Sequence, residues 1–228
     1  SDNLFKAIQQ VKIMAPPTDC LSPISQEILL KGLKKEVDAE FFTARTRPTS
    51  VYRGMPFQIE AALAYGGALG SDDLAKLMRF ANRVPLQYQQ SGCAITKSVL
   101  GTAWKNYGIQ QSKGALPAGP LLVIVHIASV WVPFTSESKE AIAHYPEIVK
   151  EIKLAIQECG RDLGRYIRKT VRAKEQKARA GLFEKYIPEL ASALSSLTKQ
   201  NKSVIEKELG GILKKNLKYI LNEDGKEN

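Results

Sequence analysis

A lysine that follows two serines is the first feature of the sequence that could bind a ligand. Residues 134–143 read FTSESKEAIA, and Ser136 and Ser138 are of the type that caps helices. If a helix begins here, Lys139 lies in or beside its first turn, where the helix dipole and free backbone N–H groups favour an anion. A lysine added to those N–H groups suits a phosphate. The alternative is a solvated lysine at an ordinary helix start.

Two aromatic residues flank a second lysine in the sequence Trp104-Lys105-Asn106-Tyr107. Aromatic rings that alternate with basic side chains are typical of surfaces that lie along a nucleic acid. The alternative is that Trp104 and Tyr107 are core residues and only Lys105 is exposed. The spacing alone slightly favours this second interpretation.

A basic segment from residue 150 to residue 185 is the third candidate site. It has eleven lysines and arginines and five acidic residues, so it holds +6 of the chain's net charge of +10. A basic helix can follow DNA phosphates with an affinity that falls steeply with salt. A solvated surface helix is the commoner case. The cations singled out for DNA are Arg161, Arg165, Arg168, Lys169 and Arg172.

A self-sufficient active site is not indicated. The sequence has two histidines and none of the motifs of zinc proteases, nucleophile elbows, P-loops or dinucleotide sites. His126 lies in an apolar run, which favours a hydrogen-bonded core histidine. The three cysteines, Cys20, Cys93 and Cys159, are far apart, so we expect neither a disulfide framework nor a metal site. This pattern fits a reducing, intracellular compartment.

The composition is that of a globular protein. With 44% hydrophobic and 25% charged residues, the 228-residue chain is not collagen-like, mucin-like or fully disordered. Its pI near 9.4 indicates an acidic partner, such as a nucleic acid, an anionic membrane surface or an acidic protein. The longest apolar run, residues 121–134, is too short to span a bilayer. We therefore expect a soluble protein, and the absence of an initiating Met suggests a piece of something longer.

Three segments have the patterns of strands. Residues 57–63 alternate between apolar and polar types, which predicts a half-buried strand. Residues 77–86 predict a second strand with Pro85 at its end or edge. The run between Pro120 and Pro133 is rich in β-branched side chains and predicts a central strand that is buried on both faces.

Helical patterns occupy much of the rest. Residues 23–35 predict a helix capped by Ser25. From Tyr145 to Tyr166 the apolar residues recur in steps of four and three, with Pro146 in the first turn. Residues 168–179 are polar all round, which is typical of a helix that leaves the protein body. Together these patterns predict an α+β fold, with a mixed β-sheet, helices on one face, and a long C-terminal helical stalk.

The order of several motifs resembles one family. The chain contains PPTDCLSPI, PTSVYRGMPFQIEAALAYGG, RFANRVPLQY, WKNYGI and HIASVWVPFTSESKEAIA, followed by the long helix. In this order they resemble the transducer domain of the B subunit of archaeal-type DNA topoisomerase VI, a type IIB topoisomerase. The resemblance covers roughly residues 18–185. It implies a ribosomal S5 domain 2-like fold, which agrees with the α+β expectation.

The resemblance also implies roles for single residues. Lys139 matches a family lysine that reaches into a Bergerat-type ATPase domain and contacts the terminal phosphate of ATP. Trp104, Lys105 and Tyr107 match the family's WKxY motif, which is associated with DNA. The ATPase domain, which binds ATP and Mg²⁺, has no counterpart motifs in this chain. We therefore expect the chain to be inactive alone.

Domains and partners follow from the same resemblance. Residues 1–17 resemble the trailing end of a helix-two-turn-helix insert, residues 18–190 the transducer with its stalk, and residues 191–228 an extension that docks on the catalytic A subunit. The implied partners are the A subunit, duplex DNA and a second B subunit, with no membrane. The implied location is the archaeal cytoplasm, at the nucleoid. The alternatives are a stand-alone basic nucleic-acid-binding module and a helical scaffold for a partner protein.

Overall fold

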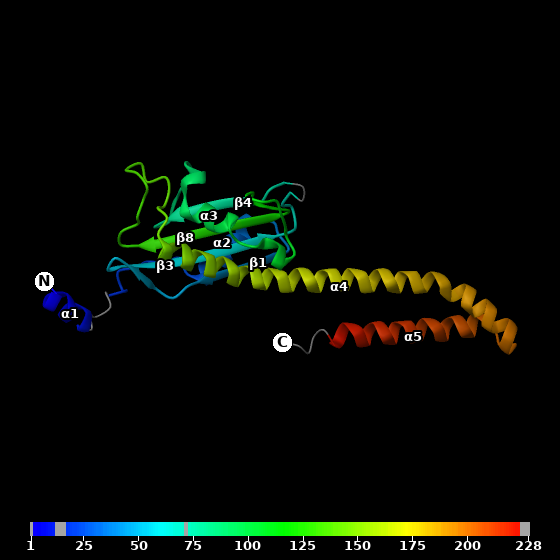
Figure 1. Ribbon diagram of the computed structural model, residues 1–228. Helices are drawn as coiled ribbons and strands as arrows, with labels where there is room; N and C mark the ends of the chain where they lie inside the picture. Colours follow the sequence, from blue (N-terminus) through cyan, green and yellow to red (C-terminus); the bar gives the residue numbers. More distant parts are fainter. Residues whose placement is uncertain (1, 12–16, 71–72, 224–228) are drawn as a thin grey trace. The chain divides into compact units, whose positions relative to one another are not determined.

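The computed structural model describes residues 2–11, 17–70 and 73–223, which divide into two units, 1–165 and 166–228. The first unit contains a β-sheet with its helices, and the second contains the later part of the long helix α4 and the helix α5 (Figure 1). The segment boundaries predicted at residues 17 and 190 stay predictions. Residues 12–16 and 224–228, within the two terminal segments, lie outside the described residues.

The sheet of the first unit is mixed. Its strands lie in the order β1 (Phe41–Thr46), β3 (Met55–Tyr65), β8 (Leu121–Ser129), β4 (Lys76–Ala81) and β5 (Val84–Pro85), and β2 (Ser50–Tyr52) also pairs with β3. β8 runs parallel to β4, whereas the other pairings are antiparallel. The predicted central strand is therefore confirmed. It ends at Ser129, before it reaches Pro133, and Val130 and Trp131 beyond it are exposed.

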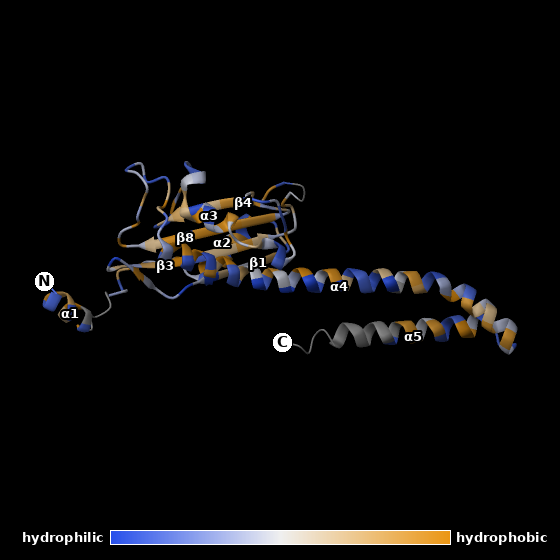
Figure 2. Ribbon diagram, in the orientation of Figure 1, coloured by the Kyte–Doolittle hydropathy of each residue, from blue (hydrophilic) through white to orange (hydrophobic). Residues whose placement is uncertain are grey.

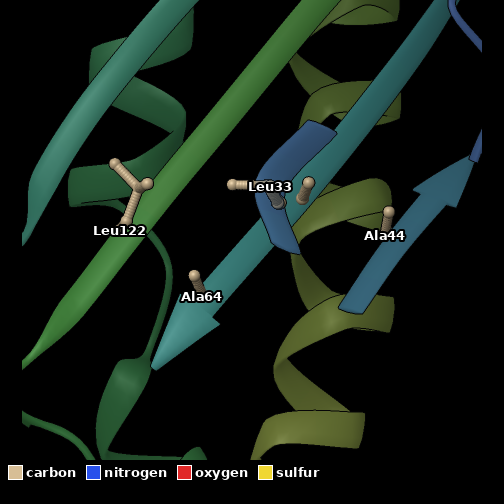
Figure 3. Close-up of a cluster of buried hydrophobic side chains, with 5 residues drawn as sticks. Leu33, Ala44, Ala64 and Leu122 are labelled. Carbon is tan, nitrogen blue, oxygen red and sulfur yellow. The ribbon is translucent and has the colours of Figure 1, made fainter. Parts of the chain in front are cut away.

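β3 is buried on both faces, so the prediction of a half-buried strand was wrong. Helix α2 (Gln26–Glu36) covers one face, where its Leu33 packs with Ala44, Ala62, Ala64 and Leu122 (Figure 3). Helix α4 (Pro146–Thr198) covers the other face, where its Cys159 thiol donates a hydrogen bond to the Ala61 carbonyl. Burial raises the pKa of Cys159 to about 12, so this thiol stays neutral.

The α+β class, the mixed sheet and the long helix are confirmed, but the helices do not all lie on one face. The run Ala61-Ala62-Leu63-Ala64 explains the difference, because apolar and mostly small side chains point to both sides of the sheet and let a helix approach each. α2 begins where predicted. Ser25 precedes it with a φ of 79°, and its side chain makes no capping hydrogen bond.

The second predicted strand, 77–86, is instead a hairpin. Asn82 and Arg83 have φ values of 46° and 69°, and they separate β4 from the short β5. Two consecutive residues with positive φ form the turn type whose twist suits a two-residue hairpin loop. Pro85 lies on the edge strand, as predicted, where its missing N–H interrupts no ladder.

Shorter elements connect the sheet to the long helices. They are the helices α1 (Asp2–Gln10) and α3 (Ala94–Leu100), the 3-10 turns η1 (Gln90–Gly92) and η2 (Trp104–Tyr107), and the small hairpin of β6 (Gln110–Gln111) and β7 (Pro117–Ala118). α4 begins at Pro146, as its apolar period predicted, and contains Pro188. α5 (Lys202–Glu223) follows it. Figure 2 shows hydrophobic colour concentrated on the strands and alternating hydrophilic and hydrophobic colour along α4.

A buried carboxylate on β3 connects the central strands to the start of α2. Glu60 accepts hydrogen bonds of 2.8 Å from the backbone N–H groups of Ile24 and Ser25, from the Thr46 hydroxyl and from Nδ1 of His126. His126 is fully buried, and its Nε2 accepts a hydrogen bond from the backbone N–H of Arg83. The core histidine predicted from the sequence is thus confirmed. Because Nε2 is an acceptor, Nδ1 carries the proton that His126 donates to Glu60.

The pKa of Glu60 reflects two opposing effects. Burial alone would raise it, whereas the hydrogen bonds from His126, Ile24, Thr46 and Ser25 favour the carboxylate and lower it below its ordinary value. A group whose pKa is lowered in the folded state stabilises that state fully above the unfolded value. The contribution is lost as the pH falls through the folded value.

Ion pairs hold the first turns of α4 to β1 and to Arg47, the residue that follows β1. Arg47 donates from Nε to Glu151 at 3.0 Å and from Nη1 to Glu158 at 2.5 Å. Arg45 Nη2 lies 2.5 Å from the Asp162 carboxylate, which also accepts a hydrogen bond from the Thr43 hydroxyl. These half-buried pairs fix the rotation of α4 relative to the sheet.

Replacing Glu60 with glutamine tests the role of this carboxylate. Glu60→Gln presents an NH₂ group to donors that need an acceptor, so we expect the free energy of unfolding at pH 7 to fall by about 1–3 kcal/mol. The difference from the wild type should shrink as the pH falls below about 4.5, the ordinary value, because Glu60 then takes up a proton in the unfolded state before it does so in the folded state. Urea unfolding at pH 7, 5 and 3.5 measures both effects. The exposed Glu36→Gln is the matched control, and an equal loss in both variants would contradict the prediction.

Candidate functional site: a loop lysine and a basic surface

Lys139 lies at the tip of a hairpin-like loop between β8 and α4. The base of the loop is fixed by hydrogen bonds from Ala143 N to Pro133 O at 2.8 Å and from Thr135 N to Ala141 O at 2.9 Å. Ala141 and Ile142 are fully buried, and the Ile142 carbonyl accepts a hydrogen bond from Ala94 N at the start of α3. The base is therefore part of the core, and the polar tip extends from it.

The prediction of a helix start at residues 136–139 was wrong, because α4 begins only at Pro146. Ser136 and Ser138 hydrogen-bond to each other at 2.7 Å, and the Lys139 N–H bonds to the Ser136 carbonyl at 3.2 Å in a tight turn. Lys139 has a φ of 56°, in the left-handed region that favours glycine. Its side chain is exposed and has no ion-pair partner among the described residues. The free cation remains, but the helix dipole does not contribute here.

Stacked aromatic rings connect the end of this loop to the sheet. Tyr145, the residue before α4, stacks on Tyr52 at 4.3 Å between ring centroids, with an interplanar angle of 32°. The Arg53 guanidinium lies 5.3 Å from the centroid of Tyr52 and 5.4 Å from that of Tyr145. Arg53 and Gly54 both have positive φ and form the turn between β2 and β3. Cation–π and stacking contacts thus hold the junction of loop and helix.

The Trp104-Lys105-Asn106-Tyr107 motif forms the η2 turn. Trp104 is fully buried, donates from Nε1 to the Val99 carbonyl at 2.8 Å, and meets Tyr107 edge to face at 6.2 Å. Its ring has no exposed face to offer a nucleic acid, so its part in the motif is to anchor the turn. Lys105 is exposed.

Tyr107 packs against α4 at a glycine. A Cβ atom added at Gly160 would lie 2.6 Å from Cε2 of Tyr107, which is closer than real contacts allow. Gly160 therefore permits this close approach, although glycine within a helix costs about 1 kcal/mol relative to alanine. The contact brings η2 beside the part of α4 that carries Arg161.

The predicted cations of α4 are all exposed. In the first unit, Arg165 pairs with Asp162, whereas Arg161 has no ion-pair partner among the described residues. In the second unit, Arg168, Lys169 and Arg172 also have none there. Among the described residues, no hydrogen bond or ion pair links Lys139 to η2, so the loop lysine and Lys105 are separate candidate sites.

The described residues do not fit ATP and Mg²⁺ as a complete site. Within the described ranges, no three acidic, histidine or cysteine side chains gather where they could hold a metal ion. The Lys139 loop offers one ammonium group, which fits an added contact to a phosphate held elsewhere. In the same part of the chain, no helix is both long enough and apolar enough to cross a bilayer.

Comparison with known proteins identifies the family. The model of the topoisomerase VI B subunit transducer matches residues 16–179. The chain belongs to this family. It is 48% identical over 214 residues to the B subunit of the type 2 DNA topoisomerase 6 of Methanococcoides burtonii, which covers 92% of this chain and 34% of that protein. It is 41% identical over 210 residues to the corresponding protein of Archaeoglobus fulgidus, which covers 92% of this chain and 35% of that protein.

The transducer chain spans about a third of the length of these relatives. Among solved structures, the B subunit of DNA gyrase from Myxococcus xanthus aligns with a TM-score of 0.34 and 22% identity, over 53% of this chain and 34% of that one.

Sequence reasoning missed the contacts that position these sites. The Arg53-Gly54 pair between two apolar segments was a signal for a two-residue hairpin turn, but nothing local placed Arg53 over Tyr145. Gly160 within an otherwise regular helical stripe was a signal for a close approach. Its partner, Tyr107, is 53 residues away in the sequence and follows only from the fold.

Exchanging glycines for alanine tests the Tyr107 contact. Gly160→Ala should destabilise the first unit by about 1–3 kcal/mol, because overpacking outweighs the helix propensity that alanine gains. Gly181→Ala, also within α4 but with nothing within 4 Å of the added Cβ, is the matched control and should increase helix stability. Urea unfolding followed by tryptophan fluorescence and by circular dichroism measures both. Stabilisation by both substitutions would show that the close packing is absent.

Proposed function

We propose that this chain is the coupling region of an ATP-dependent type IIB topoisomerase B subunit. In this proposal it relays the nucleotide state of an ATPase domain in the longer protein to strand passage by a catalytic A subunit. The observation that carries the proposal is the family match over residues 16–179, together with a free lysine at the tip of a core-anchored loop.

Lys139 is the proposed sensor of the nucleotide. Its ammonium group is exposed at the tip, while the base of the loop is buried and hydrogen-bonded, so the lysine reaches outward from a rigid support. A contact to the terminal phosphate is available only in the nucleotide-bound state. The contact would therefore differ between the nucleotide-bound and nucleotide-free states, and a switch requires such a difference. The stacked Tyr145 would pass a displacement of the loop to the first turn of α4.

DNA is the proposed partner of the basic residues. Lys105, Arg161, Arg168, Lys169 and Arg172 are exposed without carboxylate partners among the described residues, which suits contacts to backbone phosphates. Arg165 shares Asp162 and would contribute less. Trp104 and Tyr107 support the proposal indirectly, since they hold Lys105 in place.

The C-terminal segment, 191–228, is the proposed docking element for the A subunit. Exposed apolar side chains occur on both helices of the second unit, including Leu194, Leu197, Val204 and Ile212. Exposed apolar side chains of this kind are typical of a surface that another protein covers. A cytoplasmic location in an archaeon, at the nucleoid, and pairing with a second copy of the B subunit complete the proposal.

Replacing Lys139 tests the sensor role in the two-subunit enzyme that contains this chain. Lys139→Gly removes the ammonium group and suits the left-handed backbone of residue 139, so it should not weaken the turn. We expect ATP turnover in the presence of DNA to fall by at least about tenfold, as for the loss of one phosphate-stabilising donor. The measurement is steady-state phosphate release.

Two further variants complete this experiment. Lys139→Arg keeps the charge and should keep more turnover than Lys139→Gly, and Lys35→Ala, an exposed lysine on α2, should keep full turnover. Unchanged turnover in Lys139→Gly would remove the sensor role. It would then favour the stand-alone nucleic-acid-binding alternative.

Truncation tests the docking segment. A B subunit that ends at residue 190 should lose capture of the separately purified A subunit, because the apolar side chains that the A subunit would cover are gone. Leu194→Asp with Leu197→Asp should weaken capture in the untruncated protein, whereas Lys199→Asp, an exposed charged position, should not. Capture that survives truncation would place the docking surface elsewhere.

A further inference from the structure

The charge of the first unit is distributed unevenly. Between Asp73 and Glu137 the sequence has no aspartate or glutamate, although the chain has 23 acidic residues, and it has six lysines and arginines there. This stretch forms β4, α3, η2, the β6–β7 hairpin and β8. A stretch with cations and no carboxylates produces a positive potential that attracts polyanions.

Lys105 and the β6–β7 hairpin border one surface hollow. The hollow has a volume of about 420 Å³ and is lined by Lys105, Gly108, Ile109, Gln110, Gln111, Ser112 and Ala118. Lys113 follows Ser112 in the hairpin loop and is exposed. Neither lysine has an ion-pair partner among the described residues. Asp73, at the edge of the stretch, places its carboxylate beside Gly70 and does not line the hollow.

Gln111 fixes the hairpin to η2. Its side-chain amide donates hydrogen bonds to the carbonyls of Leu100 at 3.0 Å and Ala115 at 3.2 Å. Its side-chain oxygen accepts a hydrogen bond of 3.4 Å from the backbone N–H of Trp104. The turn that carries Lys105 and the loop that carries Lys113 are therefore held in one arrangement, so a ligand that contacts both has little ordering to impose.

The side chains around the hollow select the kind of partner. None of the residues that line the hollow is an exposed large apolar side chain, so its lining lacks the anchors that protein interfaces use. It also lacks a ring for stacking on unpaired bases, since Trp104 is buried and Tyr107 packs on Gly160. Ammonium, amide and hydroxyl groups remain, and these are the groups that contact backbone phosphates.

We propose that Lys105, Gln110, Ser112 and Lys113, the hairpin surface, bind the backbone phosphates of duplex DNA without reading its sequence. This inference rests on the proposed function, which includes DNA contact by Lys105. It adds the hairpin, and Lys113 in particular, to that contact. It also specifies a duplex backbone rather than bases or a single strand.

The salt dependence of binding tests the hairpin surface. The 228-residue chain is titrated into a fluorescent 20-base-pair duplex of mixed sequence at several NaCl concentrations, and anisotropy gives the binding constant. Each lysine that contacts a phosphate should contribute about 0.9 to the slope of log K against log salt. We expect Lys113→Ala to lower the slope by about 0.9 and Lys105→Ala with Lys113→Ala by about 1.8. Lys35→Ala on α2 is the control and should leave it unchanged.

The outcomes separate the inference from the proposed function. If Lys105→Ala lowers the slope and Lys113→Ala does not, the hairpin is not a contact, and the proposed function stands. If neither changes the slope, DNA contact at η2 fails as well. If Lys113→Ala weakens binding of polyglutamate as much as binding of the duplex, an acidic protein replaces DNA as the partner. Equal loss for a single strand and for the duplex would also overturn the duplex assignment.

A substitution that leaves the charge unchanged tests whether the fixed arrangement of the hairpin and η2 contributes to binding. Gln111→Leu removes the hydrogen bonds that connect the hairpin to Leu100 of α3 and to Trp104 of η2 but keeps both lysines. We expect weaker duplex binding with an unchanged salt slope, because the number of phosphate contacts stays the same while the hairpin must be ordered on binding. An unchanged affinity would show that the fixed arrangement does not contribute.

Discussion

The first unit depends on one buried carboxylate. Glu60 lies on the strand between β1 and β8 and is fully buried, and it is satisfied only because four donors from other segments converge on it. The four donors fix three elements: two backbone N–H groups fix the start of α2, the Thr46 hydroxyl fixes the end of β1, and His126 fixes β8. Through Nε2 of His126 the same network reaches the β4–β5 turn. A buried charge with unmade hydrogen bonds is costly, so the alternative placements of these segments are penalised together.

The hydrogen bonds of Glu60 hold in place the strand β8, from which the Lys139 loop extends. β8 ends at Ser129, and the loop that carries Lys139 follows it directly, with its base hydrogen-bonded and buried. On the other side, ion pairs from Arg45 and Arg47 consume three carboxylates of α4. Glu151, Glu158 and Asp162 are thus directed to Arg45 and Arg47, and Arg161 has no ion-pair partner among the described residues. Because these carboxylates of α4 form ion pairs with the sheet side, the charge of Arg161 is not neutralised and can contact a ligand.

Much of this arrangement could be predicted from the sequence, and the limits have physical causes. The apolar period after Tyr145 and the β-branched run after Pro120 are strong local signals, so α4 and the central strand were found. The hairpin at Asn82-Arg83 was missed because two apolar half-strands read as one alternating strand when the turn lacks glycine. The loop at residues 134–143 was misread because serines that cap helices also stabilise turns. The partners of Glu60, Tyr145 and Gly160 lie far away in the sequence, so no local pattern contains them.

The contact between Tyr107 and Gly160 limits how α4 can move. On either side of Gly160 around the helix stand residues with side chains, Cys159 and Arg161, and a turn of α4 about its own axis would drive one of them into the tyrosine ring. The two ion pairs of Arg47, at Glu151 and Glu158, oppose the same rotation from the sheet side. These contacts oppose rotation of the first part of α4 about its own axis. The first part of α4 is therefore held against rotation both by the sheet and by η2.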